Sequence, residues 1–288
     1  AVGMATNMAP HKLGECCDAI CAYIDNPDID TDGLMHYIKG PDFPTGGIIQ
    51  GIQGIRDAYE TGRGKVVVRA KTEIEVDNNG RETIVVTEIP YMVNKKEMLE
   101  KIGQMVDDKK IEGITYMNDE TSREGVRVIF RVKQGSNSNV VLNTLFKYTP
   151  LQSSFAINNV ALVKGRPRTL SLKDILKVFV DFRHEVIIRR TKFDLDKAKK
   201  RAHILEGLIK AIDVIDEIIR IIRASKTVDE ARNTLMTTFG FSEAQASAIV
   251  EMRLRQLTGL EREKLQAEYD ELEKFIAWCN DVLANPAM

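Results

Sequence analysis

The segment Thr61-Gly-Arg-Gly-Lys65 has residue types that could do chemistry, because glycine-rich loops can bring backbone amides close to phosphate groups. A nucleotide-binding P-loop needs a different glycine spacing and a Lys-Ser or Lys-Thr ending, and this segment has neither. The sequence therefore excludes a P-loop here. It predicts a turn that leads into a strand.

Basic side chains gather in three groups that could contact the phosphates of a nucleic acid. Such contacts position DNA without reading its sequence, and ordinary solvated strand faces are the alternative. The groups lie on or beside the polar faces of two predicted strands and in a predicted basic loop: Arg63, Lys65, Arg69 and Lys71; Arg127, Arg131 and Lys133; Lys164, Arg166 and Arg168. If they bind DNA, the acidic run Glu73, Glu75 and Asp77 should lie at the far end of its strand, away from the DNA.

Cysteine and histidine offer no further site. The three cysteines within residues 16–21 do not have the spacing of zinc ligands, and Cys279 is far away in the sequence. We expect all four to be buried thiols on helices in a reducing cytoplasm. His184 and His203 lack a matching nucleophile, which favours solvated or packing roles.

The composition is that of a folded chain without a strong charge bias. Of the 288 residues, 43% are hydrophobic and 29% are charged, and the net charge is −1. DNA binding needs a local basic patch rather than a global surplus, so this balance neither favours nor opposes it. No apolar run approaches the ~20 residues of a membrane span, and no secretory signal is visible. We therefore expect a cytoplasmic protein.

The region 1–168 mixes strands and helices. Alternation predicts one strand over 65–76, followed by a turn at 77–80 and a second strand over 83–89. The other elements expected in this region are helices over 95–109 and 139–148 and strands over 126–132 and 158–163. Strands interrupted by helices indicate an α+β or α/β domain.

The region after residue 168 is expected to be helical. Neither Gly nor Pro occurs from Arg168 to Glu206, which predicts a helix of about 36 residues, roughly 54 Å long. That length suggests one arm of a coiled coil. Capping-box patterns mark four helix starts: Ser171-x-x-Asp174, Thr227-x-x-Glu230, Ser242-x-x-Gln245 and Thr258-x-x-Glu261. The last helix is expected to return antiparallel, which leaves a helical knob at the tip of the hairpin.

Six blocks of sequence carry a family resemblance along nearly the whole chain. They are Ala1–His11, Gly40–Thr45, Thr61–Lys65, Glu88–Tyr91 with Val93–Lys95, Leu151–Gln152 with Ser154–Phe155, and Leu254–Glu261. In this order they resemble the A subunits of type IIA DNA topoisomerases, those of bacterial DNA gyrase above all, with topoisomerase IV as the alternative. The resemblance implies a tower domain over 1–168, a coiled-coil arm over 169–206 that returns over 258–288, and an all-α dimerisation knob over 207–257.

The resemblance implies DNA contacts within residues 1–11. An apolar residue at the position of Met8 wedges between base pairs in this family and bends the DNA; a core methionine under a loop is the alternative. Asn7, Pro10 and His11 accompany it as DNA-binding residues. The cleaving tyrosine of the family would lie before residue 1. Tyr148, although it stands between Lys and Thr, is therefore not expected to be catalytic, and no catalytic residue is expected in the chain.

The resemblance also implies partners. They are double-stranded DNA, a second copy of the chain, and a B subunit in an A2B2 complex. No cofactor is expected in this chain, since ATP and magnesium are used through the partner subunit. The expected dimer contacts are apolar residues of the knob: Ile212, Ile215, Ile219, Ile222, Leu254 and Leu257. We expect a fragment of a bacterial, nucleoid-associated topoisomerase that is inactive alone, and keep a structural coiled-coil dimerisation protein without a DNA role as the alternative.

Overall fold

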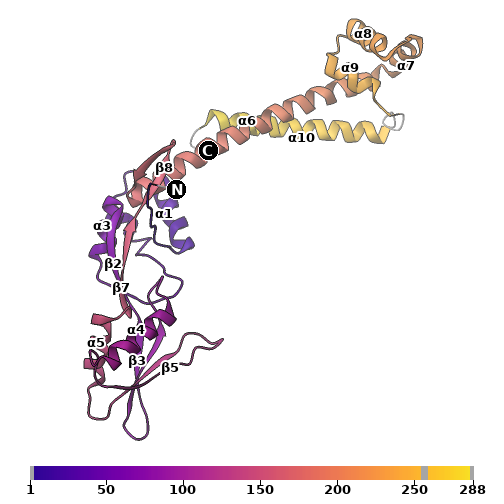
Figure 1. Cartoon of the computed structure of the whole chain (residues 1–288). Coiled ribbons are helices and arrows are strands. Elements are labelled where there is room, and N and C mark those ends of the chain that lie inside the picture. Colours follow the sequence, from indigo (N-terminus) through magenta and orange to yellow (C-terminus); the bar gives the residue numbers. More distant parts are fainter. Residues whose placement is uncertain (1–2, 254–258, 286–288) are drawn as a thin grey trace. The chain divides into compact units, whose positions relative to one another are not determined.

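The computed structural model describes residues 3–253 and 259–285 (Figure 1). The chain divides into two compact units, Ala1–Asp181 and Phe182–Met288. One long helix, α6 (Leu172–Asp213), begins in the first unit and continues into the second. Each unit is described separately below.

The first unit alternates short helices with strands. In chain order, its described elements before α6 are α1 (Leu13–Asp25), α2 (Thr31–Met35), β1 (Ile48–Gln50), α3 (Gln53–Thr61), β2 (Arg63–Arg69), β3 (Lys71–Val76), β4 (Glu82–Glu88), α4 (Lys95–Asp107), β5 (Ile114–Asp119), β6 (Val128–Val132), α5 (Ser138–Tyr148), β7 (Gln152–Asn158), β8 (Val160–Val163) and β9 (Arg166–Thr169).

The strands of the first unit form antiparallel sheets. A three-stranded sheet has the order β1-β2-β7, a four-stranded sheet has the order β3-β4-β6-β5, and β8 pairs with β9. The mixed fold predicted for this region is confirmed. The predicted helices correspond to α4 and α5, and the predicted turn is closed by the N–H of Gly80 donating to the carbonyl of Asp77 at 2.9 Å.

The single strand predicted over 65–76 is wrong, because the structure has two strands in different sheets. β2 pairs with β1 and β7, whereas β3 pairs with β4. Between them the N–H of Ala70 donates to the carbonyl of Leu151 at 2.8 Å. Val66 and Val68 face one core, and Ala70 and Ile74 face the other. The alternation therefore continues unbroken across the change of sheet.

The strand predicted over 158–163 is confirmed as β8, which spans 160–163, but the basic loop predicted after it is wrong. β7 ends at Asn158, and β8 and β9 form a hairpin. Lys164 and Gly165 make its two-residue turn with φ of 51° and 77°, the positive values that a type I′ turn requires. Arg166 and Arg168 consequently lie on a strand rather than in a loop.

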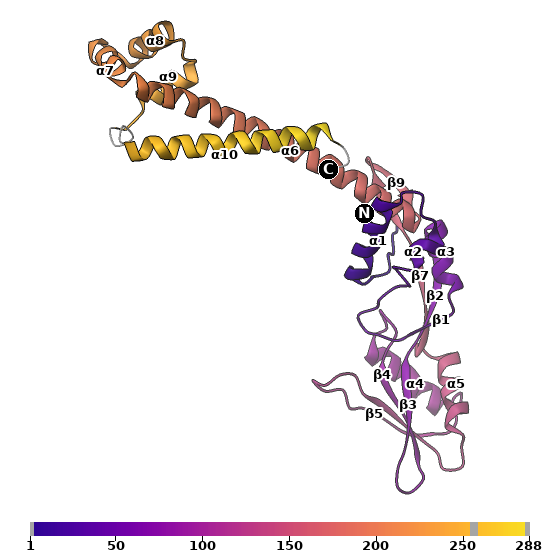
Figure 2. The ribbon, with the colours of Figure 1, turned by 180° about the vertical axis from the view of Figure 1, so that it is seen from behind.

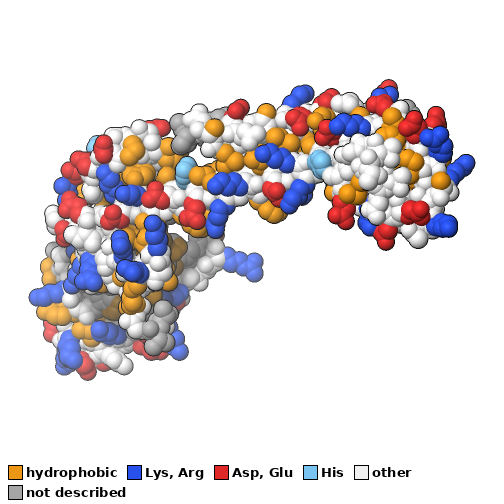
Figure 3. Space-filling view, turned by 90° about the horizontal axis from the view of Figure 1, so that it is seen from above, with side chains coloured by type: hydrophobic (Ala, Val, Ile, Leu, Met, Phe, Trp, Pro, Cys, Tyr) orange, Lys and Arg blue, Asp and Glu red, His pale blue; other side chains and the backbone are white. Residues whose placement is uncertain are grey.

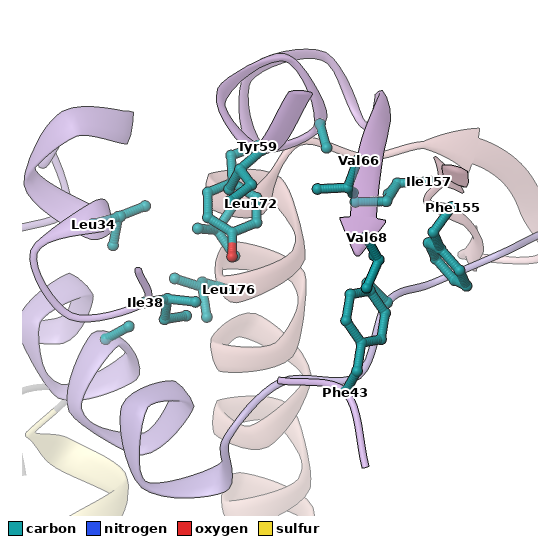
Figure 4. Packing of buried hydrophobic residues seen from close by; sticks show 14 of the residues in the cluster. Leu34, Ile38, Phe43, Tyr59, Val66, Val68, Phe155, Ile157, Leu172 and Leu176 are labelled. Atoms are coloured by element: carbon teal, nitrogen blue, oxygen red, sulfur yellow. The ribbon is translucent and has the colours of Figure 1, made fainter. Parts of the chain in front are cut away.

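The first core lies under one face of the sheet β1-β2-β7. Val66 and Val68 of β2 and Phe155 and Ile157 of β7 point into it, because successive side chains of a strand alternate between faces (Figure 4). The first turns of α6 contribute Leu172 and Leu176, and α1, α2 and α3 supply most of the other buried residues. The opposite face of the sheet is thereby left for polar side chains.

A second core in the same unit lies under the sheet β3-β4-β6-β5. Ile84, Val86, Val128 and Phe130 come from its two central strands, and none is more than 1% exposed. α4 and α5 cover them with Met98, Ile102, Val141 and Leu145. The two larger sheets of the first unit therefore each have a buried layer of their own.

The second unit is helical in its described residues. After α6 it contains α7 (Ile215–Ala224), α8 (Val228–Phe239), α9 (Glu243–Val250) and α10 (Gly259–Ala284). α6 spans 42 residues rather than about 36, and it starts as predicted. The N–H of Asp174 donates to the Ser171 hydroxyl at 3.1 Å, and the N–H of Ser171 donates to the Asp174 carboxylate at 3.3 Å.

α6 and α10 run side by side and antiparallel (Figures 1 and 2). Arg201 of α6 pairs with Glu268 of α10, and Asp213, further along α6, pairs with Arg262, earlier on α10. Charges of both signs are mixed over the visible face of this unit, the arm at the right of Figure 3. Several charged residues of α6 pair with a residue four positions away on the same helix, such as Lys200 with Asp196 at 2.7 Å.

The other predicted helix starts differ in how complete their caps are. Ser242 and Gln245 form a reciprocal capping box at α9. Thr227 caps α8 by accepting from the N–H of Glu230, but the Glu230 carboxylate accepts from the N–H of Lys226, so the box is only half formed. Thr258 lies outside the described residues.

The expectation that all cysteines are buried is wrong on α1. Cys279 on α10 is buried, whereas Cys17 and Cys21 are exposed. These two residues are four positions apart and share a helix face, while Ala19 and Tyr23 supply the buried side of α1.

Among the described residues, no helix is long and apolar enough to cross a membrane.

Candidate functional site

The exposed face of the sheet β1-β2-β7 carries the first basic group. Arg63 and Lys65 point away from the core that Val66 and Val68 enter, and both are exposed. No carboxylate of the described residues lies within 4.0 Å of either basic group. Across the ladder, Lys65 is paired with the small residue Ala156, which leaves its side chain accessible.

Arg69 and Lys71 lie where β2 passes into β3, and both have partners. The Nε of Arg69 donates to the Gln152 amide oxygen at 2.8 Å, and its guanidinium stacks over the Phe146 ring with 4.5 Å to the centroid. The Lys71 ammonium lies 3.5 Å from the Glu88 carboxylate. These two residues therefore stabilise the junction between the sheets.

Asn7 extends the same sheet by one row. Its backbone exchanges two 2.9 Å hydrogen bonds with Asn158, on the edge of β7 opposite β2. Asn158 in turn is paired with Arg63, and residues directly opposite in a ladder point to the same face. With strands about 4.8 Å apart, Asn7 and Arg63 are roughly 10 Å apart across the sheet.

Met8 follows this row and is displayed to solvent. Its side chain is 46% exposed, whereas the next residue, Ala9, is buried in the first core. The carbonyl of Pro10 accepts from the N–H of Asp42 at 2.8 Å. The expected alternative of a core methionine does not fit this exposure.

His11 is held inside the unit. One ring nitrogen, Nδ1, lies 2.8 Å from the carbonyl of Ala9, and the other, Nε2, lies 2.8 Å from the hydroxyl of Tyr59, which is 2% exposed. Desolvation by burial lowers the pKa of His11, against the opposing effects of the Ala9 carbonyl and nearby carboxylates. The ring is therefore favoured in its neutral form.

The third basic group lies near the first. The N–H of Asn159 donates to the carbonyl of Gly62 at 2.8 Å, and a Cβ on Gly62 would lie 2.5 Å from the carbonyl oxygen of Leu170. The end of β9 thus abuts the start of β2. This contact places Arg168 in the neighbourhood of Arg63, and Lys164 and Arg166 follow towards the exposed tip of the hairpin.

The second basic group lies on the other sheet. Arg127 donates to both carboxylate oxygens of Glu75, at 3.0 and 2.9 Å, and to Glu120 at 3.2 Å. Its guanidinium holds the pKa of Glu75 below the usual range. Arg131 is exposed and stacks over Tyr116 at 4.9 Å, and Lys133 is exposed just after β6.

The structure brings together two of the three basic groups. β2 extends ~20 Å before the chain enters the second sheet (Figure 1). The second basic group, on and beside β6 of that sheet, therefore lies beyond the end of β2 that is far from Arg63. The acidic residues Glu73 and Glu75 lie on β3, and Asp77 follows directly. They are thus separated from Arg63 and Lys65 along the chain, although Glu75 already neutralises Arg127.

The apolar residues expected at a dimer contact differ in burial. A third buried cluster, in the second unit, contains Ile218 of α7 with Leu205 and Leu235, and the candidates Ile215 and Ile222 pack against it while half-buried. Ile212 and Ile219 are also half-buried. The remaining candidates, Leu254 and Leu257, lie outside the described residues.

Tyr148 has an exposed ring, with the Lys147 ammonium 5.1 Å from its centroid.

Among residues 3–253 and 259–285, no cluster of three or more His, Cys, Asp and Glu side chains could hold a metal ion. His203 bridges α6 and α9, with Nε2 2.7 Å from the Ser242 hydroxyl.

Three residues that contact the segment around Met8 were not predicted from the sequence. Thr6 donates to the carbonyl of Asn158 at 3.2 Å and accepts from the N–H of Val160 at 3.3 Å. Asn158 itself and Tyr59 complete the set. Asn158 and Tyr59 lie far from Met8 in the sequence, so no local pattern links them to it.

Comparison with known proteins gives the family. The family model for the DNA gyrase and topoisomerase IV A subunits matches residues 1–288. The DNA gyrase A subunit of Streptococcus pneumoniae is 54% identical over 286 residues, which is 99% of this chain and 35% of that protein. The A subunit of Clostridium acetobutylicum gyrase is 56% identical over 285 residues, 99% of this chain and 34% of the relative.

A third relative agrees. The DNA gyrase A subunit of Leptospira biflexa is 54% identical over 286 residues, again 99% of this chain and 34% of the relative. The chain thus spans about one third of the length of these proteins. Because the family model covers every residue, this chain belongs to the family of DNA gyrase and topoisomerase IV A subunits.

Proposed function

We propose that this chain binds the flanks of the duplex that a type II topoisomerase cleaves. The observation that carries the proposal is the row Arg63–Asn158–Asn7 on the exposed face of one sheet, with the exposed Met8 next to it. Unpaired basic side chains can neutralise phosphates, and an adjacent apolar wedge can unstack a base step and bend the duplex.

The proposed surface comprises the first and third basic groups. Arg63 and Lys65 are exposed without a carboxylate partner in the described residues, and Arg168 lies close by on β9. Arg69 and Lys71 support the strand that carries them. Arg127 contributes least to phosphate binding. It would have to give up its ion pairs with Glu75 and Glu120 to bind a phosphate, so the net gain in binding free energy is small.

We further propose that the parent enzyme is an ATP-driven topoisomerase to which this chain supplies binding and dimer contacts. The α6–α10 hairpin would act as the coiled-coil arm, and α7 to α9 as the exit-gate knob that pairs with a second copy. Cleavage would need a tyrosine outside this chain, and ATP and magnesium would act through a B subunit in an A2B2 complex. Alone, the chain should neither cleave nor supercoil DNA.

The DNA proposal is tested by fluorescence anisotropy with a labelled duplex across a salt series. Each phosphate contact contributes a slope of about −0.9 to log K against log salt. Arg63→Ala with Lys65→Ala should weaken binding and flatten the slope by roughly 2. Lys101→Ala with Lys192→Ala removes the same charge from exposed helix positions and should leave the slope unchanged.

The alternative of a structural dimerisation protein without a DNA role predicts a different result. Under that alternative, the unsubstituted chain and both double variants would bind duplex equally weakly, with the same slope. Equal slopes for the two double variants would therefore reject the proposed surface.

A further inference from the structure

We propose that Thr6, Asn158 and Tyr59 are positioning residues that fix the direction in which Met8 projects. The inference rests on the proposed wedge role of Met8 and adds the residues through which the fold sets its geometry. It also gives Asn7 and His11 a different role from phosphate binding, because their polar groups already have hydrogen-bond partners within the protein.

The segment before Met8 is fixed to β7 from both backbone and side chains. The Asn7 amide donates to the carbonyl of Ala156 at 2.6 Å, in addition to the paired backbone bonds between Asn7 and Asn158. The Asn158 amide donates to the carbonyl of Ala5 at 2.9 Å. The hydroxyl of Thr6 bridges the Asn158 carbonyl and the Val160 N–H. Residues 5–7 therefore follow the sheet edge.

The segment after Met8 is fixed to the helical side of the first core. Ala9 is buried there, and its carbonyl lies within hydrogen-bond distance of His11. His11 in turn contacts the Tyr59 hydroxyl, which is anchored in the core on α3. Met8 is thus the exposed residue between two anchored stretches.

Anchoring on both sides of Met8 lowers the conformational entropy that the segment would lose on binding DNA. Met has three flexible side-chain torsions, and residues 8–10 lie outside helices and strands. A backbone that had to become ordered on each encounter with DNA would lose binding free energy to that ordering. Anchoring both flanks before DNA arrives removes that cost and leaves only the side chain of Met8 to adjust.

The roles of Asn7 and His11 follow from the same contacts. The Asn7 amide already donates to a backbone carbonyl, and both His11 nitrogens already have partners. Burial also disfavours a positive charge on His11. A phosphate would have to displace these bonds before either side chain could bind it.

The test uses a hybrid protein in which this chain replaces the matching third of the Streptococcus pneumoniae gyrase A subunit, assembled with a B subunit. Duplexes carrying 2-aminopurine at successive flank steps report unstacking as a rise in fluorescence. Thr6→Val removes the bridging hydroxyl at constant shape, Thr6→Ser keeps it, and Tyr59→Phe removes only the phenolic oxygen. Met8→Ala removes the wedge itself.

We expect Met8→Ala to abolish the fluorescence rise at one flank step. Thr6→Val and Tyr59→Phe should each lower the unstacked population roughly 2- to 10-fold, the range for one hydrogen bond, while Thr6→Ser restores it. The salt slope of duplex binding should not change, since phosphate contacts are intact. Circular dichroism confirms that each variant is folded at the assay temperature.

The outcomes separate this inference from the function on which it rests. If Met8→Ala loses the signal but Thr6→Val and Tyr59→Phe match the unsubstituted hybrid, the positioning role is wrong and the wedge stands. If the unsubstituted hybrid and Met8→Ala give the same signal, the wedge itself is wrong. A Thr6→Ser variant as weak as Thr6→Val would also reject the role of the hydroxyl.

Discussion

His11 and Tyr59 form a directed hydrogen bond in which the Tyr59 hydroxyl is the donor. The carbonyl of Ala9 can only accept, so His11 Nδ1 carries the proton and donates to it at 2.8 Å. In a neutral ring, Nε2 must then accept, and the Tyr59 hydroxyl 2.8 Å away is its donor. Protonation of His11 would place two donors face to face until the hydroxyl rotates.

This geometry predicts that acid destabilises the first unit. Burial lowers the pKa of His11 in the folded chain. As the pH drops below ~6.5, the unfolded chain therefore takes up a proton that the folded chain does not yet bind. The free energy of unfolding should therefore be at its full value above that pH and fall as the pH drops from 6.5 towards the lower pKa of the folded state. Urea unfolding at a series of pH values measures this.

His11→Gln is the matched control for the acid effect. Glutamine can keep a hydrogen bond to Tyr59 but does not titrate. The variant should lose less stability than the unsubstituted chain between pH 7.5 and 5.5. An identical loss in both proteins would assign the acid sensitivity to other groups.

A second prediction concerns two helical glycines with opposite surroundings. A Cβ on Gly54 of α3 would lie 2.0 Å from the carbonyl oxygen of Lys65, whereas a Cβ on Gly14 of α1 would meet nothing within 4 Å. Gly54→Ala should destabilise the chain by about 1–3 kcal/mol through overpacking. Gly14→Ala should stabilise it by about 0.5–1 kcal/mol through helix propensity.

Thermal and urea unfolding of the two variants check these signs. Since α3 lies against the strand that carries Arg63 and Lys65, Gly54→Ala should also weaken duplex binding, and Gly14→Ala should not. Equal effects on stability would mean that the close approach between α3 and β2 does not constrain the fold.

Features determined by neighbouring residues could be predicted from the sequence. The cap at Ser171, the box at Ser242 and the turn at 77–80 each depend on side chains within four positions of one another. Local hydrogen bonds of this kind decide where a helix or turn begins whatever the rest of the chain does.

Features that depend on distant partners could not be predicted in the same way. The break between β2 and β3 depends on Ala70 bonding to Leu151, and the apolar alternation gives no sign of it. The support of Met8 depends on Asn158 and Tyr59, which no spacing rule connects to residues 1–11. The basic residues could be identified from their type. Only the fold shows that Arg63 is exposed, whereas Arg127 forms an ion pair with Glu75.

A third prediction concerns the bond between α6 and α10. Arg201 donates to both oxygens of Glu268, at 2.7 and 3.0 Å, and this interaction raises the pKa of Arg201. Both side chains are more than 40% exposed, so solvent screening limits their coupling to about 0.5–1 kcal/mol. A double-mutant cycle of Arg201→Met and Glu268→Gln measures it.

The pair Lys200–Asp196 serves as the reference for this cycle. It has a comparable 2.7 Å contact, but both residues lie on α6 and are more exposed. Its coupling should be about 0.3 kcal/mol. If the coupling energy of Arg201 and Glu268 were no larger than this, the bidentate hydrogen bond would not stabilise the pairing of α6 with α10.

The last prediction tests the dimer contact. Ile212 and Ile219 are half-buried apolar residues of the second unit, whereas Ile218 is 1% exposed within its core. The double variant Ile212→Asp with Ile219→Asp should be a monomer in light scattering at micromolar concentration. A twofold interface would have to bury these carboxylates without positive partners, which costs more free energy than the contact gains. Ile218→Val should cost about 0.5–1.5 kcal/mol of stability and leave the dimer intact. A monomeric unsubstituted chain, or an unchanged mass for the aspartate variant, would reject this surface as the contact between copies.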